Sequence, residues 1–343
     1  MWIDANVTSF MPRAGDKGFC AYKRLFILTV CLAVIFDAVS ATAQPLKEIR
    51  IGSSNISVTN ICTFFARDRK FFAEEGFDVK IIIVKTEVAV PALVAGNLDY
   101  TTLSTSAIEA TLRGMPLRLL AVTNQYPLLG LVVREGVKKV TDLKGKKLSV
   151  SSFGGATYSA ALYLLKSNGL KPQEDVAILA TGTNMARIAA LKQEAVHAVL
   201  MSSPDDIRLA REGFRILLDV GTIFKLPWGG ISTTLPKIQE NAAEVKKVVR
   251  AVLRATRFIT ESQNRDEVIH YLSAFFKLDR SAAEEFYRRL VLSLNPTGVV
   301  DRDKIRLVID SAVERGLTDK PLDPEKVVDF SFAKEFGTLS ERQ

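Results

Sequence analysis

The sequence predicts an α/β protein made of two α/β lobes, with a ligand cleft between them and a helical C-terminal tail. Residues 46–126 and 129–222 form two blocks in which strand-like and helix-like segments alternate, and each block could form a compact five-stranded lobe. After about residue 234 the pattern is almost purely helical. Alternating strands and helices predict parallel sheets with right-handed crossovers. Ligands bind beyond the carboxyl ends of such strands, which would face one cleft.

The first 43 residues have the three parts of a secretory signal peptide. A basic region at residues 17–24 precedes an apolar run of 12 residues at 25–36, and Ala43 ends a small-residue Ala-Thr-Ala segment. A membrane span needs roughly 20 apolar residues, so this run is too short for an anchor. We expect cleavage after Ala43 and export of the mature chain.

Composition excludes several classes of protein. The 343 residues are 48% hydrophobic and 24% charged, which is an ordinary globular mixture. Two histidines and three cysteines are too few for a His/Cys-rich structural zinc site, and we expect no metal and no cofactor. The net charge of +8 is spread over mixed basic and acidic residues, which argues against nucleic-acid binding.

The first block begins with a strand at 49–51 and ends with a strand at 117–123. Glycines that can adopt the left-handed conformation mark the ends of its helices. Ser106 and Glu109 have the spacing of a capping box. The first residue of the second helix is not determined by the sequence, because Pro91 fits best at the first helical position. Between the two outer strands we expect a helix from about 59 to 75, a strand at 79–84, a short helix at 92–95, a strand at 98–103 and a helix from 106 to 113.

The second block repeats this pattern and leads into the tail. We expect strands at 129–133, 147–151, 176–179, 198–201 and 215–220, with helices at 156–167, 185–193 and 205–211. After a strand at 231–234, helices are expected at 241–262, 265–276, 281–293 and 301–315. The tail packs most simply on the first lobe, so we predict a discontinuous lobe 1 (44–126 and 226–343) and a lobe 2 (127–225), joined by crossing segments at 124–125 and 221–227.

Four segments carry a specific family resemblance. They are Pro-Ala-Leu-Val-Ala-Gly-Asn-Leu-Asp-Tyr at 91–100, Ser-Thr-Ser at 104–106, Gly-Met-Pro-Leu-Arg at 114–118 and Val-Thr-Asp-Leu-Lys-Gly-Lys-Lys-Leu at 140–148. Over about residues 46–335 the chain resembles the aliphatic-sulfonate, taurine, nitrate and thiamine-precursor group (SsuA/THI5-like, NMT1-like) of periplasmic solute-binding proteins.

The resemblance implies the type II periplasmic-binding-protein fold and a small-molecule solute as ligand. It also implies that the partner is an ABC-importer permease in the membrane, which in turn works with an ATPase. A periplasmic location and a monomeric default state are implied as well. The chain departs from the family at Glu194 and His197, where glycine and aspartate are usual. Residues 201–205 replace a Trp-Asp-Pro-type segment and remove an aromatic side chain from the expected pocket.

Candidate ligand-binding residues lie in the loops that follow strands and begin helices. Free N–H groups at helix N-termini and small hydroxyl side chains can bind an anion or a polar group, although such residues are also ordinary helix caps. Trp228 follows the second crossing segment and could stack on a ligand or fill the core. The candidates are Ser54, Asn55, Ser57, Ser104, Thr105, Ser106, Asn124, Gly154, Ala156, Thr157, Ser203 and Trp228. Arg187 could pair with an anion, but we expect it on a solvated helix face.

Two alternatives to solute binding and delivery remain. One is an exported enzyme on the same fold, of the desulfinase or pyrimidine-synthase type, and the other is a sensory binding protein. Cys62 is a candidate nucleophile, because a desulfinase of this broad fold uses a cysteine. Cys62 lies beside Phe64 and Phe65 on an apolar helix face, where a thiol is usually inert. We therefore expect no catalytic residue and a solute of sulfonate, nitrate, pyrimidine or aromatic-acid type.

Overall fold

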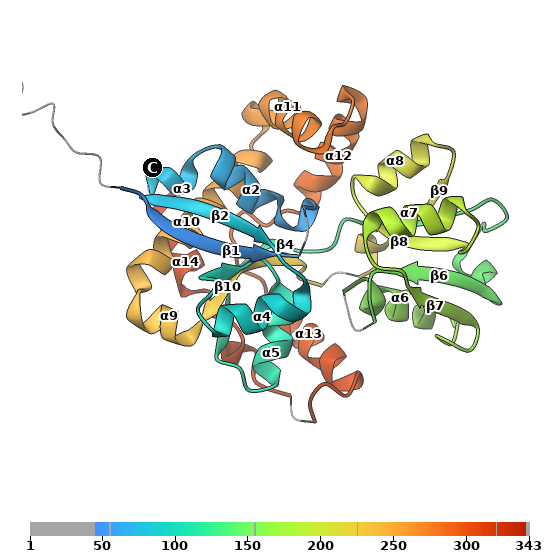
Figure 1. The fold of residues 1–343 in the computed structure, drawn as a ribbon, viewed down its shortest axis with the longest axis horizontal. Helices are drawn as coiled ribbons and strands as arrows, with labels where there is room; N and C mark the ends of the chain where they lie inside the picture. The colour runs from blue at the N-terminus through green and yellow to red at the C-terminus, as the bar shows by residue number, and fades with distance from the viewer. Residues whose placement is uncertain (1–44, 55, 154–155, 225, 320, 341–343) are drawn as a thin grey trace, which may run out of the picture. The chain divides into compact units, whose positions relative to one another are not determined.

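The computed structural model describes residues 45–54, 56–153, 156–224, 226–319 and 321–340, and two five-stranded sheets carry its fold (Figure 1). The first sheet has the strand order β2-β1-β3-β10-β4. Its strands are β1 (Lys47–Ser53), β2 (Phe77–Ile83), β3 (Tyr100–Thr101), β4 (Leu117–Asn124) and β10 (Gly229–Thr234). The expected signal peptide, residues 1–43, lies outside the described residues.

The second sheet has the strand order β7-β6-β8-β5-β9. Its strands are β5 (Leu129–Val133), β6 (Lys146–Val150), β7 (Val176–Ala180), β8 (Ala198–Ser202) and β9 (Arg215–Asp219). The α/β fold class with one sheet for each block is thus confirmed.

The prediction of parallel sheets is correct for part of each sheet and wrong for the rest. β1 runs parallel to β2 and β3, and β6 runs parallel to β7 and β8. However, β10 is antiparallel to β3 and β4, and β5 is antiparallel to β8 and β9. β5 and β10 are the first strands after the chain crosses from one sheet to the other. They enter without a crossover helix, and such a helix is what makes successive strands parallel.

Helices of the two blocks follow the predicted order with three differences. They are α2 (Ile61–Asp68), α3 (Phe71–Glu74), α4 (Thr86–Val94), α5 (Ser104–Leu112), α6 (Ala156–Ser167), α7 (Asn184–Lys192) and α8 (Asp205–Arg211). The helix expected at 59–75 is broken at Lys70, which has a left-handed φ of 62°. α4 begins at Thr86 and tolerates Pro91 in its interior, at the loss of one hydrogen bond to the carbonyl of Glu87. α5 begins at Ser104 after the N-cap Leu103, so Ser106 caps nothing.

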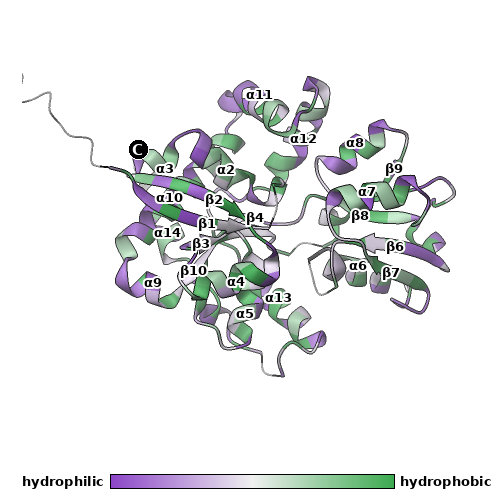
Figure 2. Ribbon diagram, in the orientation of Figure 1, coloured by the Kyte–Doolittle hydropathy of each residue, from purple (hydrophilic) through white to green (hydrophobic). Residues whose placement is uncertain are grey.

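The tail contributes α9 (Leu235–Glu240), α10 (Ala242–Thr260), α11 (Arg265–Phe276), α12 (Arg280–Ser293), α13 (Arg302–Glu314) and α14 (Ser331–Ser340), of which α9 and α14 were not predicted. α10 is amphipathic, and Val245 and Val249 on its apolar face share a core with Ile49 and Ile51 of β1. Figure 2 shows that hydrophobic and hydrophilic residues are mixed along the helices. The tail therefore packs on the first sheet, as expected. Over the described residues, no helix combines the length and apolarity that crossing a membrane requires.

Candidate functional site

A cavity of about 590 Å³ opens at the carboxyl ends of β1, β3, β6 and β8. Segments that follow strands of both sheets line it, as the binding rule for open α/β sheets predicts. The first sheet supplies Ser54, Ser57, Thr59, Asn60 and residues 102–106, and the second sheet supplies residues 151–153 and the end of β8 at Ser202. Three helices, α5, α6 and α7, begin beside these segments.

The structure places many of the predicted site residues in this lining. They are Ser54, Ser57, Ser104, Thr105, Ser106, Thr157 and Trp228. Trp228 also meets Phe224 edge-on, with ring centroids 6.2 Å apart, so one side of the indole is fixed by the core of the second sheet. Asn55 and Gly154 lie outside the described residues, and so does the side chain of Ala156, the first residue of α6.

Asn124 and Ser203 are not part of the lining. Asn124 is 2% exposed, and its amide nitrogen donates to Ser293 Oγ at 3.2 Å. This contact ties the end of β4 to α12. Ser203 is 1% exposed and follows β8, next to the lining residue Ser202. Both residues are buried outside the lining.

Two of the lining hydroxyl groups have different local roles. Thr157 Oγ1 accepts a hydrogen bond from the Ser151 N–H at 3.0 Å and lies 2.7 Å from Ser151 Oγ, so it holds the loop between β6 and α6. Ser104 Oγ is buried and has no hydrogen-bond partner in the described part of the chain. Since Leu103 is the N-cap of α5, Ser104 is not an ordinary helix cap.

Arg187 is a lining residue that the sequence analysis placed wrongly. It was expected on a solvated face, but it is 2% exposed and lines the cavity. Side chains of a helix tilt toward its N-terminus, so an arginine one turn into α7 reaches back to the carboxyl end of the sheet. The position in the helix allows this reach, and the packing around α7 decides whether the side chain is buried. Burial lowers the pKa of Arg187 to about 10, against the field of Asp205, which raises it.

The guanidinium of Arg187 is held by neutral oxygens. Nη1 donates to the carbonyl of Gly182 at 3.3 Å, and Nη2 donates to the side-chain carbonyl of Asn184. Its Nε is buried without a partner, and no carboxylate forms an ion pair with this guanidinium among the residues that the structure describes. A buried cation of this kind is costly unless a counter-charge is supplied.

Further charged residues of the lining come from the first sheet and the tail. Arg315, which ends α13, donates to Glu109 Oε1 at 2.6 Å, and both side chains are largely buried. Glu87 and Arg113 are exposed at the cavity edge. Sequence reasoning missed these residues, because nothing local indicates that the end of a tail helix returns to the cavity.

The candidates for catalysis lie elsewhere. Cys62 is 1% exposed within the core of the first sheet, and burial raises the pKa of its thiol to about 12. Cys62, His197 and His270 are not in the cavity lining. His197 instead accepts the Lys147 N–H through Nδ1 at 3.2 Å. A thiol with this pKa is protonated at neutral pH and is a poor nucleophile.

The family model described as NMT1/THI5 like matches residues 58–265. The sulfonate ABC transporter periplasmic binding protein SsuA from Methylobacillus flagellatus has a similar structure, with 20% identity, a TM-score of 0.70 and coverage of 87% of this chain and 96% of that one. The periplasmic nitrate-binding protein NrtA from Synechocystis is also similar, with 15% identity, a TM-score of 0.71 and coverage of 87% of this chain and 90% of that one.

A DszB variant in complex with biphenyl-2-sulfinic acid is also similar, with 15% identity, a TM-score of 0.64 and coverage of 85% of this chain and 99% of that one. No curated protein matches the chain. At these identities the solved structures show the shared fold alone, whereas the family model spans more than half of the sequence. The chain therefore belongs to the NMT1/THI5-like family and has the fold of periplasmic solute-binding proteins.

Proposed function

We propose that this protein captures a small organic anion in its cavity and delivers it to an ABC-importer permease. The observation that carries the proposal is Arg187, a buried cation in the lining that has no acidic partner in the described chain. A solute anion would supply the missing counter-charge and the missing acceptor for Nε, and charge-assisted hydrogen bonds of this type are strong.

The surrounding backbone favours the same charge. α5, α6 and α7 begin at or beside the cavity, and the N-terminus of a helix carries a partial positive charge and free N–H groups. Hydroxyl groups of Ser104, Ser151 and Ser202 lie in the same lining. These groups can donate to oxygens of a sulfonate or carboxylate without adding bulk.

Cavity size and apolar lining favour an organic solute over a bare inorganic ion. A volume of about 590 Å³ lies within the range of roughly 300–1,000 Å³ that small-molecule sites occupy. Phe153, Trp228, Val90 and Leu317 offer apolar surface to the rest of the solute. Among the solute types that the sequence suggested, aliphatic sulfonates and aromatic acids fit this combination better than nitrate.

Delivery follows from hinge closure in this proposal. Solute contacts from both sheets would be complete only in a closed state, and the solute would shift the population toward that state. The N-terminal signal, periplasmic location and permease partner belong to the same proposal. The enzyme alternative lacks its cysteine, because Cys62 is buried away from the lining with a protonated thiol.

A binding screen with recovery of the solute tests the proposal. The mature protein is titrated with methanesulfonate, benzoate, nitrate and uracil by calorimetry, and the bound solute is then identified by mass spectrometry. We expect an organic anion to bind and to be recovered unchanged. Binding of uracil alone would contradict the anionic solute, and chemical conversion of the solute would support the enzyme alternative.

Arg187→Gln provides the site-directed arm of this test. Loss of the guanidinium should weaken anion binding by at least about tenfold, which corresponds to about 1.4 kcal/mol. Arg215→Gln is the control, because Arg215 lies on β9 of the second sheet, is exposed and is absent from the lining. Equal affinities of the two variants would place the anion elsewhere.

A further inference from the structure

Arg187 is oriented by an amide and not by an acid. The side-chain oxygen of Asn184 accepts from Arg187 Nη2, and the side-chain nitrogen of Asn184 donates to Asp205 Oδ2 at 2.6 Å. The amide therefore stands between a guanidinium and a carboxylate. Because its oxygen faces the donor and its nitrogen faces the acceptor, both contacts determine which way the amide points.

Asp205 is itself held in place. It is the first residue of α8, and its Oδ1 lies 2.5 Å from Arg208 Nη1. Arg208 in turn donates to the carbonyl of Phe276 at the end of α11. Neither Asn184 nor Asp205 is part of the cavity lining. Hydrogen bonds thus link Asp205 at the start of α8 to Asn184, and Asn184 to Arg187. Of these three residues, only Arg187 lines the cavity.

The order of the three groups has an electrostatic consequence. A carboxylate in direct contact with Arg187 would hold the guanidinium equally well, but it would also satisfy the charge and compete with any anion in the cavity. An interposed amide orients the guanidinium and leaves it without a carboxylate in direct contact. The Nε of Arg187 remains without a partner in the described chain, as this arrangement requires.

We propose that Asn184 is a specificity-determining residue that positions Arg187 for an anionic solute while keeping the carboxylate of Asp205 away from it. The inference rests on the proposed function and adds the device that selects for anions. Burial lowers the pKa of Arg187 despite the opposing field of Asp205, which agrees with a guanidinium that lacks a carboxylate in direct contact. Asn184 acts through Arg187 and is a positioning residue, not a solute contact.

Exchange of the two side chains tests the proposal. The double variant Asn184→Asp/Asp205→Asn keeps the net charge and the amide–carboxylate pair, but it moves the carboxylate onto Arg187. We expect an unchanged melting temperature and at least about tenfold weaker binding of methanesulfonate or benzoate, whichever binds the unmodified protein. A merely structural role of the pair would be restored by the exchange, and affinity would then equal that of the unmodified protein.

Single variants separate charge from folding. Asn184→Asp should weaken anion binding, whereas Asp205→Asn should leave affinity within about threefold, because an amide at 205 still accepts from Asn184. Weaker binding in Asp205→Asn than in Asn184→Asp would overturn the proposal. If the unmodified protein binds the anion and the exchanged variant binds it with equal affinity, the role of Asn184 is overturned. The proposed function is then unaffected. Failure of both anions to bind the unmodified protein overturns the proposed function and the inference with it.

Discussion

At the scale of single residues, hydroxyl groups that look alike in the sequence have different roles in the structure. Ser104 and Thr157 both lie near the start of a helix and both line the cavity. Thr157 makes two contacts with Ser151, while Ser104 Oγ is buried without a partner among the described residues. From the sequence, each could equally be a ligand contact or a cap, because residue type alone does not say what the oxygen meets.

Ser104→Ala and Thr157→Val should therefore differ in stability. Ser104→Ala removes a buried hydroxyl that has no hydrogen bond to lose, so the free energy of unfolding should change by less than about 0.5 kcal/mol. Thr157→Val leaves the Ser151 N–H without its acceptor and should cost about 1 kcal/mol or more. Urea unfolding of the two variants measures both values. Equal losses would mean that Ser104 has a partner in solution.

Arg187 shows what residue type can and cannot predict at this scale. The sequence places an arginine in the first turns of a helix, and solvated arginines are common there. Its burial depends on how α7 packs beside the second sheet and on the cavity lining, to which both sheets contribute. Those contacts join residues far apart in the chain, so local pattern alone could not decide between the solvated face and the cavity.

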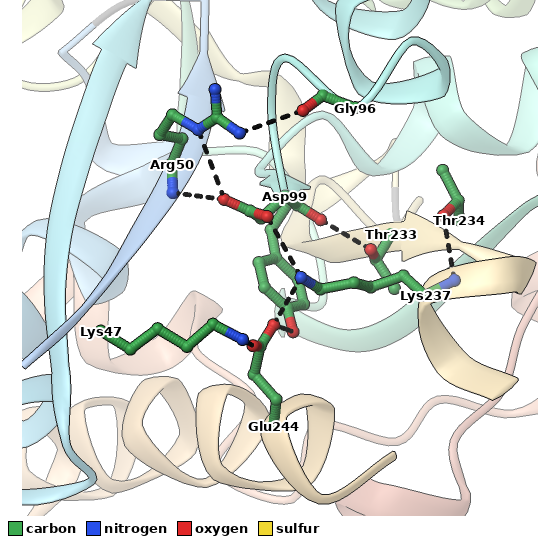
Figure 3. A network of polar contacts seen from close by, with 9 residues as sticks. Lys47, Arg50, Gly96, Asp99, Thr233, Thr234, Lys237 and Glu244 are labelled. Carbon is green, nitrogen blue, oxygen red and sulfur yellow. Dashed lines mark hydrogen bonds and ion pairs between the residues drawn. The ribbon is translucent and has the colours of Figure 1, made fainter. Parts of the chain in front are cut away.

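At the scale of elements, a partly buried ion network lies beside β10 in the first sheet (Figure 3). Lys237, just after β10, lies 3.1 Å from Asp99 Oδ1 and 2.7 Å from Glu244 Oε1. Glu244 on α10 also accepts from Tyr100 at 3.0 Å and pairs with Lys47 of β1 at 2.5 Å. Network residues thus come from β1, β3, α9 and α10, and Thr233 of β10 donates to the carbonyl of Asp99 at 2.7 Å.

Glu244 gives this network a pH dependence. Burial alone would raise the pKa of Glu244, but hydrogen bonds from Lys237 and Lys47 lower it overall below its ordinary value of 4.5. A carboxyl group with a lowered folded-state pKa stabilises the protein above the unfolded value, and this stabilisation is lost as the pH falls through the folded-state pKa. The free energy of unfolding should therefore fall between about pH 5 and pH 3 less steeply in Glu244→Gln than in the unmodified protein. Urea unfolding at several pH values gives the two slopes, and identical slopes would contradict the assignment.

At the scale of the whole molecule, α12 of the tail is tied to the second sheet. Arg289 lies 2.9 Å from Asp206 Oδ2 on α8 and 3.0 Å from Asp219 Oδ2 at the end of β9. Asp206 is 0% exposed and packs over Gly130, where a Cβ would lie 2.8 Å from Asp206 Oδ2. The tail, predicted to pack on the first lobe, therefore also contacts the second sheet through a buried charge.

Arg289→Met should leave Asp206 as a buried carboxylate without its main counter-charge. Losing one partner of a buried ion pair costs about 3 kcal/mol. Burial raises the pKa of Asp206 against the influence of Arg289. A raised carboxyl pKa means that the folded state takes up a proton more readily, so the cost of the variant should be larger at about pH 8 than at about pH 5.

Urea unfolding at both pH values tests this, with Arg288→Met as the control. Arg288 is the neighbouring exposed arginine of α12, so it matches the change in charge and helix position. The control should lose little stability at either pH. Equal losses in the two variants, or a loss that grows as the pH falls, would show that Asp206 does not depend on Arg289.

The sequence by itself determined the α/β class, the two blocks and many element boundaries. β5, α6, α8 and α11 have the predicted limits, because glycine stops, β-branched runs and amphipathic spacing act within a few residues of the element that they define. The sequence also indicated seven of the residues that line the cavity, through their place at the ends of strands.

Only the tertiary structure decided the directions of β5 and β10, the burial of Arg187 and the return of Arg315 to the cavity. Each of these depends on contacts between segments far apart in the chain. Strand direction follows from how the chain enters a sheet, and the burial of a charge follows from what the rest of the molecule places around it. Neither quantity is encoded in the spacing of nearby residues, which is why the cavity arginine was expected in solvent.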